Sequence, residues 1–136
     1  MASLNSIEGI GAKYADKLRA SGTRTAEALL DNGATRRGRA ELARIAGLSE
    51  KRILEWVNRA DLMRIKGVST QYSDLLEAAG VDSVRELASR NVRSLASRLA
   101  EVNEKGRQRL VRRVPSEAVV QKWVAEAKKL PKVVRH

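Results

Sequence analysis

The stretch that decides the fold is residues 4–18, LNSIEGIGAKYADKL, which returns 58 positions later as residues 62–76, LMRIKGVSTQYSDLL. Apolar residues keep their places in both copies, and the two glycine turns centre on Ile10 and Val68. A second block repeats at an offset of 67 residues and brings Trp56 into register with Trp123. The chain therefore contains two copies of one unit, and the larger offset leaves nine additional residues in the second copy.

The local sequence predicts helices throughout. Ala, Leu, Arg, Glu and Lys dominate, and the strict alternation typical of strands is absent. Ser49 and Ser116 are placed to cap helices, and Ser83 and Glu86 have the spacing of a capping box. We expect about nine or ten short helices, the longest of them near residues 50–64.

The turn in each copy resembles the helix-hairpin-helix motif, in which a Gly-hydrophobic-Gly turn joins two short helices. A weaker copy surrounds Gly47-Leu48-Ser49, and a fourth, at Val114-Pro115-Ser116, has no glycine. The resemblance implies an all-α fold with tandem helix-hairpin-helix pairs, built as two repeated units of about five short helices in one compact domain. The first unit would span residues 1–61, the second would span 62–130 with a basic insertion near 104–113, and 131–136 would form a C-terminal tail.

The charge of the chain is strongly asymmetric. It carries 27 Lys and Arg against 16 Asp and Glu, a net charge of +11, and residues 90–136 alone hold 13 basic and 4 acidic side chains. Such a balance indicates a polyanionic partner. Aromatic residues make up 3% of the chain, so stacking platforms for single-stranded bases are few.

Composition also argues against catalysis. Cysteine is absent, and the single histidine is His136, so thiolate chemistry, histidine acid–base chemistry and zinc clusters have no residues to use. We therefore expect a non-enzymatic cytoplasmic protein without cofactor or metal. No apolar run is long enough to span a membrane, and we expect no membrane partner.

The glycine turns point to phosphate. Glycine allows positive φ and close approach of the backbone, and the N–H groups that open the next helix attract anions. The same turn also arises where two helices merely cross closely, so the flanking charges decide between the two interpretations. Lys13 and Lys17 follow the first turn, whereas Gln71 and Leu75 stand at their places in the second copy.

Two further clusters are basic. Arg36, Arg37 and Arg39 lie beside Gly33 and Gly38, which predict a loop or a frayed helix start. The insertion in the second copy is the most basic stretch of the chain. The candidate nucleic-acid-binding residues are Gly9, Ile10, Gly11, Lys13, Lys17, Arg36, Arg37, Gly47, Ser49, Lys51, Arg107, Arg109, Arg112 and Arg113.

The whole pattern is also similar to a bacterial family known only as a domain of unknown function with tandem helix-hairpin-helix motifs. The similarity rests on residues 7–11, on the junction of residues 60–68, on Trp56-Val57, and on Tyr72, Leu75-Leu76 and Trp123. It implies the fold and says little about function, because a fold hosts many activities.

The sequence thus predicts a non-catalytic nucleic-acid-binding module that contacts the phosphate backbone with little sequence specificity. Duplex DNA is the favoured ligand and RNA remains an alternative. The competing hypothesis is a protein-interaction adaptor, in which degenerate helix-hairpin-helix surfaces dock an acidic protein partner.

Overall fold

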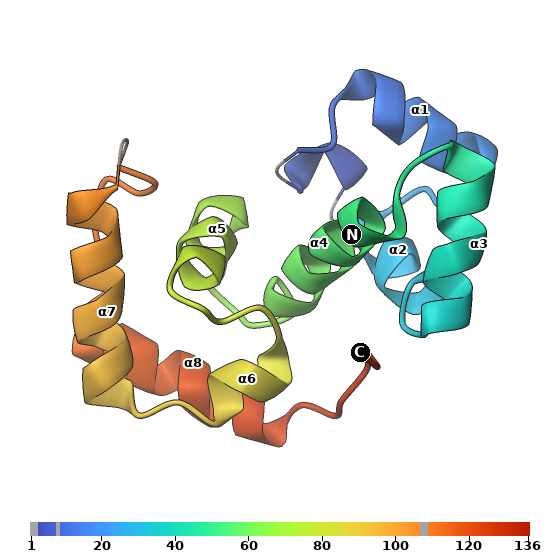
Figure 1. Cartoon of the computed structure of the whole chain (residues 1–136). Helices are drawn as coiled ribbons and strands as arrows, with labels where there is room; N and C mark the ends of the chain where they lie inside the picture. Colours follow the sequence, from blue (N-terminus) through green and yellow to red (C-terminus); the bar gives the residue numbers. More distant parts are fainter. Residues whose placement is uncertain (1–2, 8, 107–108) are drawn as a thin grey trace. The chain divides into compact units, whose positions relative to one another are not determined.

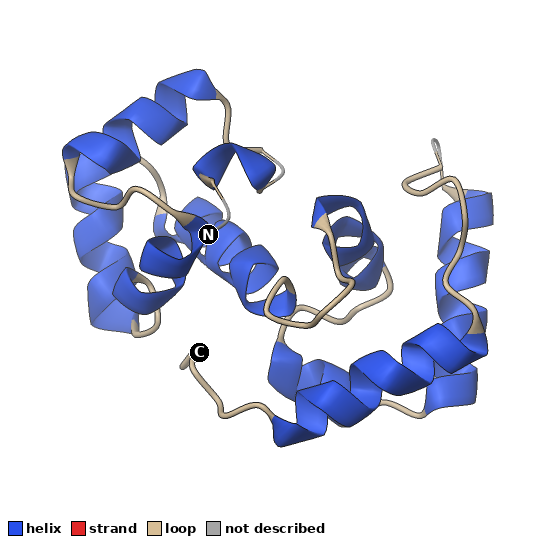
Figure 2. Ribbon diagram, turned by 180° about the vertical axis from the view of Figure 1, so that it is seen from behind, coloured by secondary structure: helices blue, strands red, loops and turns tan. Residues whose placement is uncertain are grey.

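The computed structural model describes residues 3–7, 9–106 and 109–136, and helices are its only regular elements there (Figures 1 and 2). An isolated antiparallel bridge joins Ser3 to Thr25. The all-helical class is therefore confirmed. The helices are η1 (a 3-10 turn, Leu4–Ser6), α1 (Ala12–Ala20), α2 (Ala26–Asn32), α3 (Arg36–Ala46), α4 (Glu50–Leu62), α5 (Thr70–Ala78), α6 (Val84–Ala88), α7 (Val92–Lys105) and α8 (Glu117–Lys129).

One expectation about helix length is wrong. The longest described helix is α7, with 14 residues, whereas α4 has 13 and ends at Leu62. The chain leaves the helix after Leu62 because the Ile65–Val68 turn begins there, with the Ile65 N–H donating to the Leu62 carbonyl at 3.1 Å.

The chain forms two compact units. The first contains the residues up to Asp61 together with Lys132–His136, and the second runs from Leu62 to Pro131. In the first unit α1 and α2 pack on α3; in the second, α8 packs on α6 and α7 while α5 packs on α7. The second unit is thus an insertion into the chain of the first.

The sequence repeat returns in the backbone geometry. In the first unit the Ile10 N–H donates to the Ile7 carbonyl at 3.2 Å, and in the second the Val68 N–H donates to the Ile65 carbonyl at 3.1 Å. Gly9 and Gly67 adopt φ values of 92° and 90°, a region that side chains avoid. Both turns therefore follow the same path.

Each turn lies against a tryptophan from a later helix. A Cβ built on Gly9 would lie 3.0 Å from Trp56 Nε1, and one built on Gly67 would lie 3.4 Å from Trp123 Nε1. Both indoles are buried, and each ring packs on the tyrosine of its own unit, Tyr14 at 5.6 Å and Tyr72 at 5.3 Å between centroids. The two repeated tryptophans are therefore part of the core of their units, whereas the tyrosines are only half-buried.

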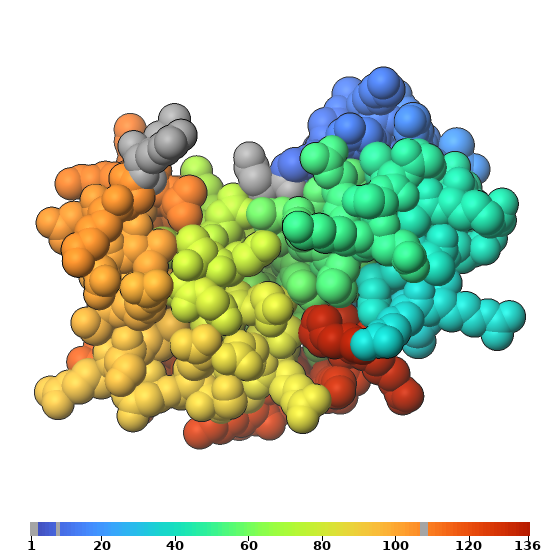
Figure 3. All heavy atoms as spheres, viewed as in Figure 1, coloured from blue at the N-terminus to red at the C-terminus, as the bar shows by residue number. Residues whose placement is uncertain are grey.

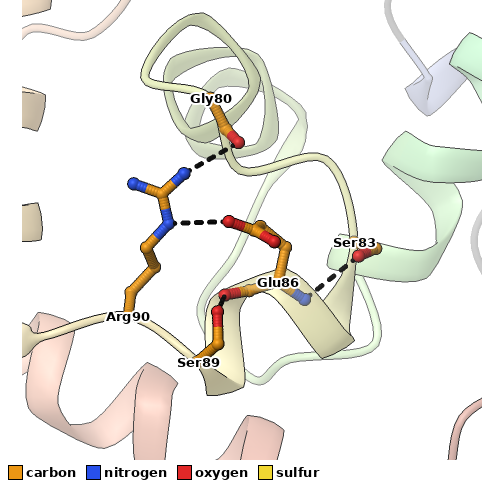
Figure 4. A network of polar contacts seen from close by, with 5 residues as sticks. All are labelled: Gly80, Ser83, Glu86, Ser89 and Arg90. Atoms are coloured by element: carbon orange, nitrogen blue, oxygen red, sulfur yellow. Dashed lines mark hydrogen bonds and ion pairs between the residues drawn. The ribbon is translucent and has the colours of Figure 1, made fainter.

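The joint between α5 and α7 is fixed by a short polar network (Figure 4). Ser83 Oγ accepts from the Glu86 N–H at 3.1 Å, which is the N-cap expected from the sequence. The Glu86 carboxylate accepts from Arg90 Nε at 2.9 Å, and Arg90 also donates to the Gly80 carbonyl at 3.0 Å. The network ties the start of α6 to the end of α5.

The arginine cluster at residues 36–39 is helical, so the expectation of a loop or frayed start is wrong. Thr35 caps α3 by accepting from the Gly38 N–H at 3.0 Å. Glycine at this place serves close packing, since a Cβ on Gly38 would lie 2.1 Å from the Asn32 carbonyl oxygen. The glycine that suggested a loop instead allows α3 to begin against the end of α2.

The last residues pack on the first unit. Val134 is buried, and the Arg135 N–H donates to the Ala34 carbonyl at 2.7 Å. Arg39, itself buried, donates to the Arg135 carbonyl at 2.7 Å and to the Gly33 carbonyl at 2.9 Å. Figure 3 shows this red segment against the cyan residues that include α3. The predicted C-terminal tail is therefore an integral part of the first unit from Lys132 onward.

Candidate nucleic-acid interface

The start of α1 is open to solvent. Gly11 is its N-cap residue, in an extended conformation, and no side chain caps the helix. A Cβ built on Gly11 would meet nothing within 4 Å, so the fold itself does not require glycine there. The first N–H groups of α1 have no partner within the helix and lie at its positive end.

The equivalent helix of the second unit is closed. Ser69 takes the place of Gly11, and its side chain accepts the Tyr72 N–H at the start of α5. This cap occupies one of the N–H groups that an anion would otherwise use. The two turns therefore share a backbone path and differ in what they offer a ligand.

Lysines flank the open helix start. Lys13 and Lys17 are exposed on α1, whereas Ile10, predicted from the sequence as a contact residue, is buried and belongs to the core. Lys17 Nζ also lies near the second turn of this unit, 4.0 Å from where a Cβ on Gly47 would be. The fold therefore brings Lys17, which follows the first turn, close to the Gly47 turn, 30 residues further along the chain.

The second turn supplies the start of α4. Gly47 adopts a left-handed conformation with φ 68°, and Ser49 Oγ accepts from the Arg52 N–H at 3.1 Å. Lys51 and Arg52 are exposed in the first turn of α4. The uncapped start of α1 and the Ser49-capped start of α4 thus belong to one surface, which we call the unit 1 basic face: Gly11, Lys13, Lys17, Gly47, Ser49, Lys51 and Arg52.

Arg52 follows Lys51 beside the Gly47 turn but is not among the candidate residues chosen from the sequence. Its guanidinium carbon lies 5.5 Å from the centroid of the Tyr14 ring, and its Nη1 donates to the Tyr14 hydroxyl at 3.2 Å. An arginine over an aromatic ring gains a cation–π contact. Comparison of the two copies could have drawn attention to this residue, because Val119 stands at the place of Arg52 in the second copy.

Arg36 and Arg37 do not join this face. They lie in the first turn of α3, whereas the Gly47 turn follows its last residue, roughly 15 Å along the axis of an eleven-residue helix. Arg36 Nε donates to the His136 carbonyl at 2.9 Å. The structure therefore assigns Arg36 a contact with the C-terminal segment and leaves Arg37 exposed beside it.

The inserted segment of the second unit is anchored. Arg107 lies outside the described residues. Buried Asn103 accepts from the Leu110 and Val111 N–H groups at 2.8 and 3.1 Å and donates to the Val111 carbonyl at 3.0 Å. Val111 is itself buried. One side chain of α7 therefore fixes the path of the segment that carries the predicted arginines.

Three of those arginines surround a hollow. Arg109, Arg112 and Arg113 are exposed and line a depression of about 440 Å³ together with Leu110, Val111, Gln71 and Tyr72. The Tyr72 hydroxyl donates to the Arg113 carbonyl at 3.1 Å. The inserted arginines thus lie beside the first turn of α5, the helix that follows the Gly67 turn in the same unit.

Charge elsewhere is largely structural. Burial lowers the pKa of Arg39, with a smaller contribution from the positive charge of Arg36. A hydrogen bond from Arg44 lowers the pKa of the Glu41 carboxyl. No group of three or more His, Cys, Asp or Glu side chains able to hold a metal occurs in the part of the chain that the structure describes.

The described part of the chain has no helix long and apolar enough to cross a lipid bilayer.

The protein is small, basic and all-helical, and it is built from a repeated turn-and-helix unit. A family model, described as a domain of unknown function (DUF4332), matches residues 8–130, and the chain belongs to this family. No curated protein and no solved structure matched the chain.

Proposed function

We propose that this protein is a non-catalytic nucleic-acid-binding module of the cytoplasm whose glycine turns are tandem helix-hairpin-helix motifs. The observation that carries the proposal is the uncapped start of α1. Gly11 has no side chain and open space around it, so the first N–H groups of the helix are accessible beside Lys13. A phosphate oxygen accepts hydrogen bonds from such N–H groups at the positive end of the helix.

The chemistry of the unit 1 basic face favours backbone contact over base recognition. Exposed lysines and helix N–H groups bind phosphates without reading sequence. Lys13 and Lys17 lie one turn apart on α1, and Lys17 reaches the Gly47 turn. Regularly spaced phosphates of duplex DNA, the favoured ligand, suit such a row better than a single anion does. Structured RNA offers the same phosphates.

The salt dependence of binding tests the proposal. Affinity for a random duplex is measured by fluorescence anisotropy across a salt series for the wild type and for Lys13→Gln/Lys17→Gln. Each phosphate contact contributes about −0.9 to the slope of log K against log salt, so the double variant should lose roughly 1.8 from the slope. Lys128→Gln/Lys129→Gln, which removes two exposed lysines from the last turn of α8, is the charge-matched control.

Failure of the test has a clear form. A wild-type affinity that does not change with salt, or no binding at low salt, would remove the proposal. Equal effects of the α1 and α8 substitutions would show that general charge, rather than the unit 1 basic face, attracts the duplex. Competition with duplex RNA on the wild type separates the two nucleic acids.

A second candidate function is docking of an acidic protein partner by the second unit. Ser69 already caps α5, so this turn offers less to a phosphate. Leu110, among the inserted arginines, and Val119, on α8, are each 38% exposed, which a purely electrostatic nucleic-acid surface does not need. We propose this function for the second unit alone, alongside phosphate binding by the first.

A further inference from the structure

The environment of the repeated tyrosine differs between the two units. In the first unit Arg52 lies over the Tyr14 ring and bonds its hydroxyl. In the second unit Val119 stands at the place of Arg52, and the Tyr72 hydroxyl bonds the backbone of Arg113 instead. The second copy has therefore exchanged a covering charged side chain for an exposed apolar one.

Two hollows of the second unit have Tyr72 in their lining. One is the depression of about 440 Å³ beside Arg109–Arg113. The other, of about 630 Å³, is lined by Lys66, Gly67, Tyr72, Val119, Lys122, Trp123 and Glu126. Tyr72 lines both hollows, which therefore adjoin at this residue, and we call their combined lining the Tyr72 groove.

Apolar side chains occur on each side of this groove. Leu110 lines the first hollow and Val119 lines the second, and each is 38% exposed. On α8, residues 119, 122, 123 and 126 follow the spacing of one helix face. The groove therefore offers anchor points for two apolar side chains of a ligand.

The rest of the lining is basic. Lys66, Lys122, Arg109, Arg112 and Arg113 are exposed around the apolar positions. Glu126 is the one acidic residue among the described residues that line either hollow. Its carboxylate already accepts the Lys66 N–H at 2.9 Å. A ligand that complements this lining needs apolar side chains together with negative charge.

We propose that the Tyr72 groove binds an acidic peptide segment of a partner protein, with apolar side chains anchored on Leu110 and Val119 and carboxylates paired with the surrounding lysines and arginines. The proposal rests on the second candidate function and is independent of phosphate binding by the first unit. A nucleic-acid strand supplies the negative charge but has no aliphatic anchors for the two apolar positions.

The repeat itself supplies the decisive variant. Val119→Arg introduces the residue that covers the tyrosine in the first unit, and Val119 is exposed enough for the fold to accept it. Ala118→Arg adds the same charge at the neighbouring exposed position of α8, outside the lining of either hollow. The two variants have equal net charge and differ in whether the groove is blocked.

The probe is a short fluorescein-labelled peptide in which leucine and glutamate alternate, compared with a peptide in which serine replaces every leucine. Val119→Arg should weaken binding of the leucine peptide roughly tenfold, the effect of removing one packed anchor worth about 1.4 kcal/mol. Ala118→Arg should bind it at least as tightly as the wild type, because its added charge attracts the peptide. Leu110→Ser should weaken binding without changing charge.

Several results would overturn the proposal: no saturable binding of the leucine peptide, equal affinity for the serine peptide, or equal behaviour of the two arginine variants. Stronger competition by oligothymidine than by the leucine peptide would assign the groove to a nucleic-acid strand instead. Random duplex DNA is titrated against the same variants in parallel. Val119→Arg leaves the unit 1 basic face intact, so loss of peptide binding with retained duplex binding separates the two functions.

Discussion

Gly9→Ala and Gly11→Ala form a matched pair that separates folding from binding. Gly9 has φ 92°, and the added methyl group would lie 3.0 Å from Trp56 Nε1. Backbone strain of this kind costs about 1–3 kcal/mol, and crowding a packed side chain costs about 1–3 kcal/mol more. We therefore expect Gly9→Ala to lower the free energy of unfolding of the first unit by about 2–6 kcal/mol.

The second member of the pair should behave in the opposite way. Gly11 has φ −80° and open space around its missing side chain. Alanine there reduces the entropy of the unfolded chain but is a poorer N-cap than glycine, so the two effects oppose each other and stability should change by less than about 1 kcal/mol. The same methyl group stands between the helix N–H groups and a phosphate, and duplex affinity should fall roughly tenfold, the loss of one charge-assisted hydrogen bond of about 1.5 kcal/mol.

Urea unfolding followed by circular dichroism and tryptophan fluorescence measures the stabilities, and anisotropy measures duplex binding. Gly67→Ala is the internal reference, with φ 90° and a longer methyl distance of 3.4 Å to Trp123 Nε1. Its cost should approach the strain alone, about 1–3 kcal/mol. A neutral Gly9→Ala would refute the structural reasoning, and a Gly11→Ala variant with unchanged duplex affinity would refute the role of the open helix start.

Three further outcomes follow from individual contacts. Asn103→Ala removes three hydrogen bonds to the inserted segment and should lower the free energy of unfolding by about 2–4 kcal/mol, measured by urea titration, with faster amide exchange at Val111. Val134→Ala should cost about 1–2 kcal/mol, because this side chain is buried on the first unit; a neutral result in thermal unfolding would contradict its burial. The hydrogen bond from Arg44 lowers the pKa of Glu41, so their pair stabilises the fold above the ordinary glutamate pKa of about 4.3 and loses its effect as pH falls through the lowered value. Glu41→Gln should therefore lower the urea midpoint at neutral pH and leave it unchanged near pH 2; a difference that persists in acid would contradict this.

The repeat made the framework of the fold predictable. Two copies of one sequence pattern are expected to pack in the same way, and both place a tryptophan against a glycine with positive φ. Caps were equally readable, because Ser83 and Ser116 act through their nearest backbone neighbours. Local rules and repetition carry such information, and neither needs knowledge of distant contacts.

Distant contacts explain what the sequence could not reveal. Gly38 indicated a loop because its close approach to Asn32 belongs to helix packing, which composition does not report. Arg39 counted as surface charge, yet its partners include a carbonyl 96 positions away. For the candidate interface, the sequence found Lys13 and Lys17 but not the approach of Lys17 to Gly47, because that depends on how α1 packs on α3.

Because the C-terminal segment belongs to the first unit, the order of synthesis affects the order in which the two units can finish folding. Val134 and the Arg135 backbone complete the core and hydrogen bonding of a unit whose other residues end at Asp61. A nascent chain on the ribosome therefore has all the described residues of the second unit before the first unit can finish. Until residues 134 and 135 emerge, Arg39 lacks its hydrogen bond to the Arg135 carbonyl, and the surface that Val134 covers stays exposed to water. The unit that is translated first is thus the one that reaches its final structure last.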